Sequence, residues 1–468
     1  MVLFPLEPMG ETNALIDSDE ARTISYGELL YSSQKIQALA PQEKTLIFLF
    51  SRNRPDEIAA YIGGLNAGHT IGLFDGTMPA AFKQQLVKLY YPHYVLDHAA
   101  EQEGYEQIAS PWNSLKAYRL INPRQAPRLH PHLQLLLATS GTTGNPKLIR
   151  LSQANLISNA RSIIQYLKIN PKERACASLP FHYSYGLSVL HSHLLAGASI
   201  VLTQSSAAQQ PFWNAMQSYA CTSLAGVPYT YRLMDRLGFE KIDLPALKTL
   251  TQAGGKLESS LVLKYHDMMR RRGGSFLVMY GQTEATARIA YLPPKHLPKK
   301  SEAIGIAIPG GKLQLYLEGH EITAPNQIGE LVYHGPNVML GYASSAEDLL
   351  KDDEMKGWLP TGDLGYFDAE GIYFITGRIK RISKVYGLRI NLDDVETALS
   401  RFGIAAATTT DVQICIFLEH GSPELCEKCI RHLADLYGLH PSTFRCLALS
   451  LLPRTSSGKI NYQQLASL

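Results

Sequence analysis

The segment from residue 135 to residue 147 carries the clearest chemical pattern in the chain. A buried-strand pattern, Leu-Leu-Leu-Ala, passes directly into Thr-Ser-Gly-Thr-Thr-Gly-Asn-Pro-Lys. Glycine lets the backbone approach an anion because positive φ costs it little, and successive backbone N–H groups can form a nest for phosphate. The hydroxyls and one ammonium add donors without bulk. The predicted phosphate-binding residues are Thr139, Ser140, Gly141, Thr142, Thr143, Gly144 and Lys147.

This loop is not a Walker A motif, because Lys147 is followed by Leu148 rather than by Ser or Thr. Taken alone, it fits an ordinary Gly/Thr turn after a strand about as well as a phosphate loop. Four further segments in the chain also combine glycine with hydroxyl or charged side chains. They are 278–284 (Val-Met-Tyr-Gly-Gln-Thr-Glu), 358–363 (Trp-Leu-Pro-Thr-Gly-Asp), 377–384 (Gly-Arg-Ile-Lys-Arg-Ile-Ser-Lys) and 453–459 (Pro-Arg-Thr-Ser-Ser-Gly-Lys).

In this order, the five segments resemble those of the adenylate-forming superfamily, which includes acyl- and aryl-CoA ligases, adenylation domains of nonribosomal peptide synthetases and beetle luciferases. The resemblance covers nearly the whole chain, from residues 23–29 (Thr-Ile-Ser-Tyr-Gly-Glu-Leu) to Lys459, and five motifs in order are highly specific. It is strongest toward acyl-CoA and acyl-carrier-protein ligases. It implies an enzyme that uses ATP and Mg²⁺ to convert a carboxylic acid to acyl-AMP with release of pyrophosphate, and then transfers the acyl group to a thiol.

The resemblance also implies a role for each segment, and each role is chemically sensible. The loop that ends in Lys147 would bind the β- and γ-phosphates, Thr283 the α-phosphate, and Glu284 the magnesium ion, a hard cation that prefers carboxylate and phosphate oxygens. Asp363 would accept hydrogen bonds from the ribose hydroxyls with help from Arg378. Gly254 and Gly255 would pack against adenine, and the remaining nucleotide-binding positions are Tyr280 and Gly281.

The C-terminal motifs imply a second half-reaction and a moving domain. Lys459 would be the catalytic lysine of adenylation, acting as a mobile point charge. Lys380 falls at the family's hinge, and the strand from Lys384 to residue 387 would face the site in the thioester-forming pose. Lys459 serves only the first pose, so its loss should spare thiol transfer from preformed acyl-AMP. The chain departs from the family at Arg381, where an acidic residue is common.

Residues 179–187 (Leu-Pro-Phe-His-Tyr-Ser-Tyr-Gly-Leu) resemble the family's acid-binding segment. Amino-acid-activating members carry an aspartate where this chain has His182, and no carboxylate occurs between residues 181 and 202. An aromatic pocket with a few polar groups suits an aryl acid or a short-to-medium acyl acid. For Tyr185, a purely structural role is an equal alternative. The predicted pocket residues are His182, Tyr183, Tyr185, Gly226 and Tyr229.

The thiol acceptor stays open at the level of sequence, because CoA and the phosphopantetheine arm of a carrier protein end in the same group. No Asp-Ser-Leu-like carrier attachment site follows Lys459, so any carrier protein is expected to be a separate partner. Alternative functions are a stand-alone amino-acid adenylating enzyme that loads a peptidyl carrier protein, a luciferase-like oxygenase, and a catalytically silent binding or scaffold protein. The last is disfavoured because the charged residues of all five segments are present.

The elements that must position these residues alternate between short apolar runs and helical patterns. Strand patterns at 45–50, 70–74, 133–138, 199–203 and 223–227 flank helical patterns at 55–65, 152–167 and 212–219. This alternation predicts an α/β fold with layered, largely parallel sheets. Strands separated by Gly and Pro turns at 311–317, 329–334 and 372–377 predict a β-rich subdomain.

We therefore predict three parts: a large adenylating domain at 1–377 that binds ATP and the acid, a hinge at 378–381, and a small mobile α+β domain at 382–468. A net charge of +3 gives no argument for nucleic acid. The N-terminus lacks a secretory pattern and no apolar run approaches a membrane span, so a cytoplasmic location is expected. Cys426 and Cys429 share a helix face with His432, which favours packing over metal binding.

Overall fold

A computed structural model describes residues 3–41, 44–98, 102–138, 147–385, 388–410, 413–455 and 458–468. The chain forms two compact units. The first contains the described residues up to 138, together with 147–312 and 333–359, and the second contains 313–332 and the described residues from 360 to 468.

The first unit contains an eight-stranded sheet built around β3, which we call the β3 sheet. Strand β3 pairs in parallel with β4 and β5, and β4 pairs in parallel with β8, whereas the flanking strands are antiparallel. The strand order is β20 (Gly341–Ala343), β9 (Leu148–Ser152), β8 (Leu133–Ala138), β4 (Thr70–Asp75), β3 (Leu46–Ser51), β5 (Tyr94–Asp97), β7 (Lys116–Leu120) and β6 (Tyr105–Ile108).

A second run of paired strands in the same unit is here called the β12 sheet. Its central strands are parallel from β1 to β14, and antiparallel strands follow at both ends. The strand order is β16 (Ala303–Ala307), β15 (Ala290–Leu292), β14 (Ser275–Tyr280), β13 (Thr249–Gln252), β12 (Ser223–Gly226), β10 (Arg174–Cys176), β11 (Ser199–Leu202), β1 (Asn13–Asp17) and β2 (Arg22–Ser25).

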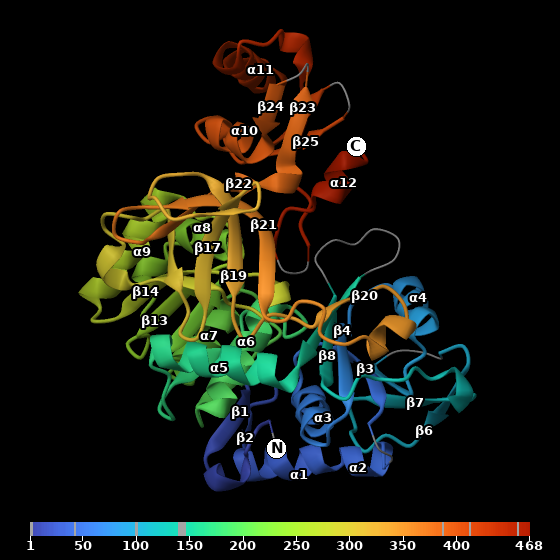
Figure 1. The fold of residues 1–468 in the computed structure, drawn as a ribbon. Helices are drawn as coiled ribbons and strands as arrows, with labels where there is room; N and C mark the ends of the chain where they lie inside the picture. Colours follow the sequence, from blue (N-terminus) through green and yellow to red (C-terminus); the bar gives the residue numbers. More distant parts are fainter. Residues whose placement is uncertain are drawn as a thin grey trace. The chain divides into compact units, whose positions relative to one another are not determined.

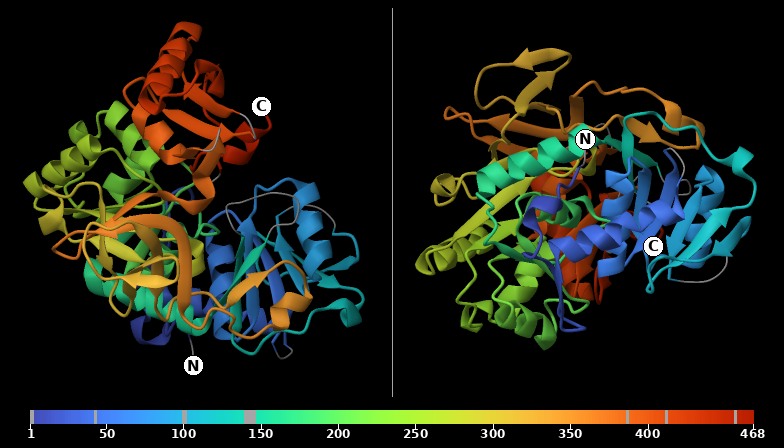
Figure 2. Two further views of the ribbon diagram at one scale, coloured as in Figure 1. Left: turned by 45° about the horizontal axis from the view of Figure 1, so that its top comes forward. Right: turned by 90° about the horizontal axis from the view of Figure 1, so that it is seen from below.

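Helices separate and cover these sheets. Apolar side chains of both sheets meet α1, α3 and α6 in one core, and α4 covers the other face of the β3 sheet with a second cluster (Figure 1). Helix α1 extends from strands β1 and β2 to helix α3 (Figure 2, right). The helices are α1 (Tyr26–Gln34), α2 (Ile36–Leu39), α3 (Pro55–Asn66), α4 (Ala80–Tyr90), α5 (Gln153–Leu167), α6 (Ser184–Leu195), α7 (Gln210–Ser218), α8 (Pro228–Arg236) and α9 (Ser259–Arg271).

Local sequence explains where the helices nearest the site begin. Helix α5 starts at a capping box, in which the Ser152 hydroxyl accepts from the backbone N–H of Asn155 and the Asn155 side chain accepts from the backbone of Ser152. Pro55 occupies the first turn of α3, where its fixed φ suits the helix and its missing N–H is not needed. Helix α3 follows the carboxyl end of β3, at the edge where polar residues gather, whereas α5 follows the antiparallel strand β9, whose last residue pairs with Leu133 at the opposite edge.

Among the described residues, the second unit contains three groups of paired strands. Its larger group of strands is ordered β18 (His320–Ile322), β17 (Lys312–Leu317), β19 (Gly329–His334), β21 (Trp358–Phe367) and β22 (Tyr373–Arg378). The C-terminal part holds the pair β23 (Ile382–Val385) and β24 (Leu388–Asn391), and a sheet of β25 (Ala405–Thr409), β26 (Ile414–Glu419) and β27 (Phe444–Leu449). Helices α10 (Leu392–Leu399), α11 (Pro423–Tyr437) and α12 (Tyr462–Ala466) pack on this last sheet.

The structure confirms the predicted α/β class with large, mainly parallel sheets. It adds the antiparallel strands β6, β7, β9 and β20, which the sequence analysis did not anticipate, because a short apolar strand carries no sign of its direction. Within the described ranges, no helix combines the length and apolar composition that crossing a membrane requires.

Candidate active site

The loop after β14 holds the two residues predicted to contact phosphate and metal. Thr283 and Glu284 lie in a 3-10 turn at Thr283–Ala285. The Thr283 hydroxyl is 3.1 Å from the Ser184 hydroxyl, at the first residue of α6. Glu284 Oε1 accepts a hydrogen bond from the Tyr342 hydroxyl at 2.9 Å, and burial together with the Glu284 charge raises the pKa of Tyr342, so the phenol stays a donor at neutral pH.

Glu284 has the chemistry expected of a magnesium ligand. No lysine or arginine among the described residues forms an ion pair with it, so its negative charge is balanced by no side-chain cation there. Its remaining oxygen lone pairs fit a hard cation together with phosphate oxygens. The backbone of Glu284 is fixed as well, because its carbonyl accepts from the backbone N–H of Met339 at 2.8 Å.

Gly281 allows this loop to fold back on itself. A Cβ at this position would lie 1.9 Å from the carbonyl oxygen of Ala287 and 2.9 Å from the Cα of Arg288. Any larger residue would therefore push the end of the loop away. Two buried amides, those of Asn159 and Asn337, donate to the carbonyl of Arg288 at 3.2 and 2.9 Å. The loop from residue 281 to residue 288 is thus held at both ends.

The predicted acid-binding segment leads into α6 and contains two tyrosines in different settings. Tyr185 is only 2% exposed, and its hydroxyl contacts the carbonyl and hydroxyl of Thr251 at 2.8 and 2.9 Å. Tyr183 is partly buried, and its ring meets that of Tyr185 edge-on at 6.2 Å between centroids. Burial raises the pKa of Tyr183 to about 12, while the charge of Arg288 acts to lower it.

His182 lies beside carboxylates that come from another part of the chain. Its Nε2 is 3.7 Å from Asp75 Oδ2 at the end of β4, and neither ring nitrogen has a hydrogen-bond partner among the described residues. Burial lowers the pKa of His182, against the raising effect of Asp75 and Glu57. The sequence analysis saw only that no carboxylate follows residue 181 closely. The proximity of Asp75 could not be predicted, because Asp75 precedes His182 by about a hundred residues in the sequence.

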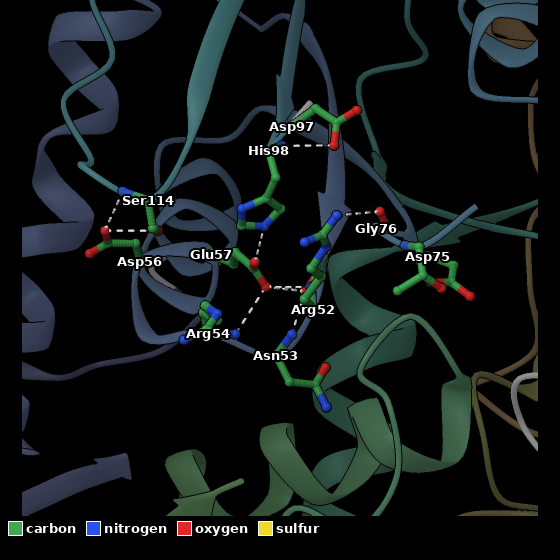
Figure 3. A network of polar contacts seen from close by, with 12 residues as sticks. Arg52, Asn53, Arg54, Asp56, Glu57, Asp75, Gly76, Asp97, His98 and Ser114 are labelled. Atoms are coloured by element: carbon green, nitrogen blue, oxygen red, sulfur yellow. Dashed lines mark hydrogen bonds and ion pairs between the residues drawn. The ribbon is translucent and has the colours of Figure 1, made fainter. Parts of the chain in front are cut away.

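A polar network that includes Glu57 and His98 lies at the carboxyl ends of β3, β4 and β5 (Figure 3). The fully buried carboxylate of Glu57 accepts from Ser51 Oγ at 2.7 Å and from the backbone N–H of Arg52 at 2.6 Å, and it pairs with His98 Nε2 at 2.5 Å. The side chain of Asn53 bonds to Leu179 and Phe181 at 3.2 and 2.8 Å. The network therefore fixes the backbone just before His182.

The predicted adenine contacts Gly254 and Gly255 follow β13, and the other predicted pocket and nucleotide-binding residues of this region lie at the ends of β12 and β14 and at the start of α8. Gly226 ends β12, and a Cβ there would lie 2.8 Å from the ring of Tyr231. Gly254 has a φ of +86°, and Gly255 packs against Pro228, to which an added Cβ would come within 3.3 Å. Tyr229 is 42% exposed at the start of α8. Tyr280 ends β14.

Asp363 and Arg378 come together in the second unit. They face each other in the antiparallel pair of β21 and β22, with Arg378 Nε donating to Asp363 Oδ1 at 2.9 Å. Asp363 is buried at 4% exposure, whereas the Arg378 side chain is 63% exposed. The pair therefore presents one fixed carboxylate whose charge is partly balanced by a surface arginine.

Lys459 lies in the short hairpin closed by the bridge between Arg454 and Ile460. Its carbonyl accepts from the backbone N–H of Thr455 at 2.8 Å. Lys380 falls in the turn Ile379–Arg381, and Lys384 lies on β23. Their roles as catalytic, hinge and thiol-facing residues stay predictions.

Arg381, the departure from the family pattern, is paired within the second unit. Its guanidinium contacts Asp393 Oδ1 and Glu396 Oε1, each at 2.5 Å, and lies 4.2 Å from the centre of the Tyr462 ring. The Tyr462 hydroxyl donates to Glu396 Oε2 at 3.0 Å. The acidic residue missing after Lys380 is thus replaced by a basic one that binds two acidic residues of α10.

Most of the predicted phosphate loop, Thr139, Ser140, Gly141, Thr142, Thr143 and Gly144, lies outside the described residues. Lys147 is described and is exposed just before β9. The sequence analysis missed Arg288, which lies between the Thr283–Glu284 turn and β15. The available signal was a single charge in the otherwise apolar run of residues 287–290.

Comparisons with known proteins agree with this arrangement. The AMP-binding enzyme family matches residues 7–343, which is most of the chain. Sulfoacetate–CoA ligase of Cupriavidus necator is 30% identical over 75% of this chain and 71% of its own length. The chain therefore belongs to the AMP-binding enzyme family, the adenylate-forming group that its motifs predicted.

Two further similarities concern sequence and fold. Oxalate–CoA ligase of Arabidopsis thaliana is 29% identical over 71% of this chain, and the match spans 66% of its own length, just under two thirds. The structure of o-succinylbenzoate coenzyme A synthetase from Bacillus subtilis in complex with AMP matches the fold. Its TM-score is 0.78 at 21% identity, over 98% of this chain and 96% of that one.

Proposed function

We propose that this protein activates a carboxylic acid with ATP and transfers the acyl group to the thiol of CoA. In the first step a carboxylate oxygen attacks the α-phosphorus, the bond to the β-phosphate breaks, and pyrophosphate leaves. In the second step the thiol sulfur attacks the acyl carbon, its proton is released, and AMP leaves. Membership of the family and the names of relatives that act on CoA support both steps.

The observation that carries the proposal is the position of the Thr283–Glu284 turn. It is held against the first residue of α6, Ser184, which belongs to the predicted acid-binding segment, so that Thr283 and Ser184 touch. This contact supports an α-phosphate next to the carboxylate of the acid, as attack on phosphorus requires. Glu284 would hold Mg²⁺, which neutralises charge on the phosphates.

The remaining site residues keep the roles that the resemblance implies. Within this proposal the loop before β9, including Lys147, binds the outer phosphates, and Asp363 with Arg378 binds the ribose. Lys459 stabilises charge during adenylation, and Lys384 serves the thiol-transfer step after rotation about Lys380.

An amino acid is a poor substrate for this site. Arg288 is buried at 3% exposure close enough to Tyr183 for its charge to act on the phenol. An α-ammonium group in the pocket would add a second cation near that guanidinium, where screening by water is weak. This argues against the amino-acid adenylating alternative more directly than His182 does, since Asp75 partly offsets the histidine.

The test is exchange of labelled pyrophosphate into ATP with aryl, aliphatic and amino acids, comparing wild type with Lys459→Ala. We expect exchange with one class of acid and a loss of about 100-fold or more in the variant, because a charge that stabilises the transition state is removed. Lys428→Ala, which removes an exposed lysine of α11, is the matched control and should keep full exchange.

The same variants test the second step. Lys459→Ala should still form thioester from preformed acyl-AMP and CoA at close to the wild-type rate. Replacing CoA by a phosphopantetheinyl carrier protein identifies the acceptor, and a product that forms without any thiol would point to oxygenase chemistry instead. Absence of exchange with every acid would contradict adenylation and favour the silent binding protein.

A further inference from the structure

Arg288 is a buried cation whose guanidinium lacks an ionic partner. The residue is 3% exposed, and the guanidinium carbon lies 4.0 Å from the centre of the Tyr185 ring. Its Nη1 reaches the carbonyl of Ala287 only at 3.5 Å, and its Nε has no hydrogen-bond partner among the described residues. No carboxylate in the described part of the chain forms an ion pair with it.

Two other arginines with little exposed surface in the described part of the chain are paired. Arg150, which has no exposed surface, binds Glu354 Oε2 at 2.6 Å and several backbone carbonyls. Arg381 binds two carboxylates of α10. Because an unpaired charge in the interior is strongly unfavourable, buried charges are almost always paired. Arg288 is the exception among these three, so its partner is expected to come from outside the chain.

The side chain lines a narrow cavity in the first unit, between α5, α6 and the strands β10, β12 and β13. Besides Arg288, polar residues line it, but they are bonded to the protein: Ser188 donates to the carbonyl of Tyr185 at 2.7 Å. Glu173 also lines the cavity, but its Oε2 accepts from the Thr222 hydroxyl at 2.5 Å and it forms no ion pair with Arg288. Although Arg288 also hydrogen-bonds the Tyr166 phenol, its Nε is the buried polar atom of this lining that has no hydrogen-bond partner among the described residues.

The cavity is close to the predicted reacting end of the acid. Arg288 follows Thr283 by five residues, so their Cα atoms are at most about 17 Å apart. The rings of Tyr183 and Tyr185, from the predicted acid-binding segment, lie next to the guanidinium. Gly281, Asn159 and Asn337 fix the backbone of Arg288, so the cation has a defined position before any ligand binds.

We propose that the acid activated by this protein carries a second anionic group, a carboxylate or a sulfonate. This group binds Arg288 in the cavity described above. This inference rests on the proposed adenylating function and narrows its substrate class. Two oxygens of a planar carboxylate or of a tetrahedral sulfonate can accept two parallel hydrogen bonds from the guanidinium. An acid with a purely hydrocarbon tail would leave the cation unpaired in both the free and the bound protein.

The dimensions favour a compact diacid. The cavity has a volume of about 30 Å³, measured as the space open to the centre of a water molecule. One water needs about 10–15 Å³ on this measure, so the cavity has room for two or three waters. A carboxylate or sulfonate group has three or four heavy atoms outside the chain and fits this space. A long alkyl chain or a second aromatic ring does not.

The test pairs each diacid with the neutral analogue of the same length in the pyrophosphate-exchange assay: succinate with butyrate, glutarate with valerate, phthalate with 2-methylbenzoate, and sulfoacetate with propionate. With wild-type protein, we expect kcat/KM for one diacid to exceed that of its analogue by at least about 100-fold, the range of a buried charge pair. The sulfonate arm shows which oxyanion is accepted.

Arg288→Met and Arg288→Lys identify the source of the preference. Methionine keeps the length without the charge, so the preference should disappear or reverse toward the neutral acid, mainly through KM. Lysine keeps the charge without the bidentate fork and should retain part of it. Arg150→Met is the matched control for loss of a buried arginine, and any activity that it retains should show the wild-type ratio of diacid to monoacid.

The outcomes separate this inference from the proposed function. Exchange that favours neutral acids in the wild type overturns the inference, and it leaves adenylation standing. A diacid preference that survives in Arg288→Met overturns the assignment to Arg288. Absence of exchange with every acid contradicts the proposed function itself. If Arg288→Met does not fold, the wild-type panel and Arg288→Lys still decide the question.

Discussion

Two buried arginines of the first unit, Arg150 and Arg288, have the same chemistry and opposite surroundings. Arg150 lies on β9, where the neighbouring strand β20 and the turn after it supply Glu354 and the carbonyls of residues 340, 342, 351 and 352. Gly341 leaves space for this contact, since a Cβ there would meet the guanidinium at 2.7 Å. Arg288, in contrast, lies over the face of the Tyr185 ring and lines a cavity.

The partners of a buried arginine indicate whether its role is structural or whether it binds a ligand. A charge that the chain itself neutralises holds segments together, and its removal breaks those contacts. A charge that the described residues do not neutralise is held in place at a cost to stability, and such a cost persists where binding requires it. Three measurements test whether Arg150 and Arg288 differ in this way.

The largest expected effect is on stability. Arg150→Met should lower the free energy of unfolding by about 3–5 kcal/mol, because several carbonyls and a carboxylate lose their donor. Arg288→Met should change it by no more than about 1 kcal/mol, because the lost contact with the Tyr185 ring is offset by relief of an unpaired charge. Denaturant unfolding of both variants measures this, and equal losses would show that Arg288 is as structural as Arg150.

The next effect is stabilisation by ligand. A diacid that supports exchange should raise the unfolding free energy of the wild type by about 2.7 kcal/mol at a concentration 100 times its Kd. The midpoint of thermal unfolding should rise accordingly, and Arg150→Met should show a similar rise from its lower starting point. The same diacid concentration should barely move Arg288→Met. A full shift in that variant would place the second anionic group elsewhere.

The smallest effect concerns a neutral residue on the wall of the same cavity. Burial lowers the pKa of His193 to about 4, although its contact with the Val189 carbonyl and the charge of Glu173 act in the opposite direction. Between pH 6.5 and pH 4 the unfolded chain therefore binds one more proton at this residue than the folded chain. Stability must fall as the pH falls, by about 1.4 kcal/mol per pH unit for this histidine.

The variant His193→Gln can still donate to the Val189 carbonyl. It should lower the dependence of the unfolding free energy on pH by about 1.4 kcal/mol per pH unit, the contribution of one proton. The measurement is the unfolding free energy at pH 7, 6 and 5. His191 lies on the same helix, and its pKa is lowered by burial to about 3, so it adds a second proton that persists in the variant. An unchanged slope in His193→Gln would mean that His193 is already charged beside Arg288.

Much of the fold and part of the site could be predicted from local sequence. The strands at 133–138 and 329–334 were predicted to the residue, and the helix predicted at 152–167 begins one residue after its cap, Ser152. The roles of Gly281 and Glu284 stay predictions, and they could be made because a loop after a buried strand has its polar residues adjacent in sequence. Such features need no knowledge of distant partners.

What could not be predicted depends on residues far apart in the chain. Nothing near His182 in sequence indicates Asp75, and nothing near Arg288 indicates whether a carboxylate reaches it. Tyr185 has the same sequence signature whether it lines a pocket or packs in the core, and only its contact with Thr251 shows that its hydroxyl is committed to the protein. These contacts join residues that are far apart in sequence, so they become visible only in the folded structure.

The Arg381 cluster has a mechanical consequence for the small domain. Arg381 is clamped to α10 through Asp393 and Glu396, and Glu396 also binds Tyr462 at the start of α12, three residues after Lys459. These contacts link the residue after Lys380 to the two segments that follow it in the small domain. If Lys380 is the hinge proposed above, Arg381, α10 and the start of α12 are expected to rotate together as one body.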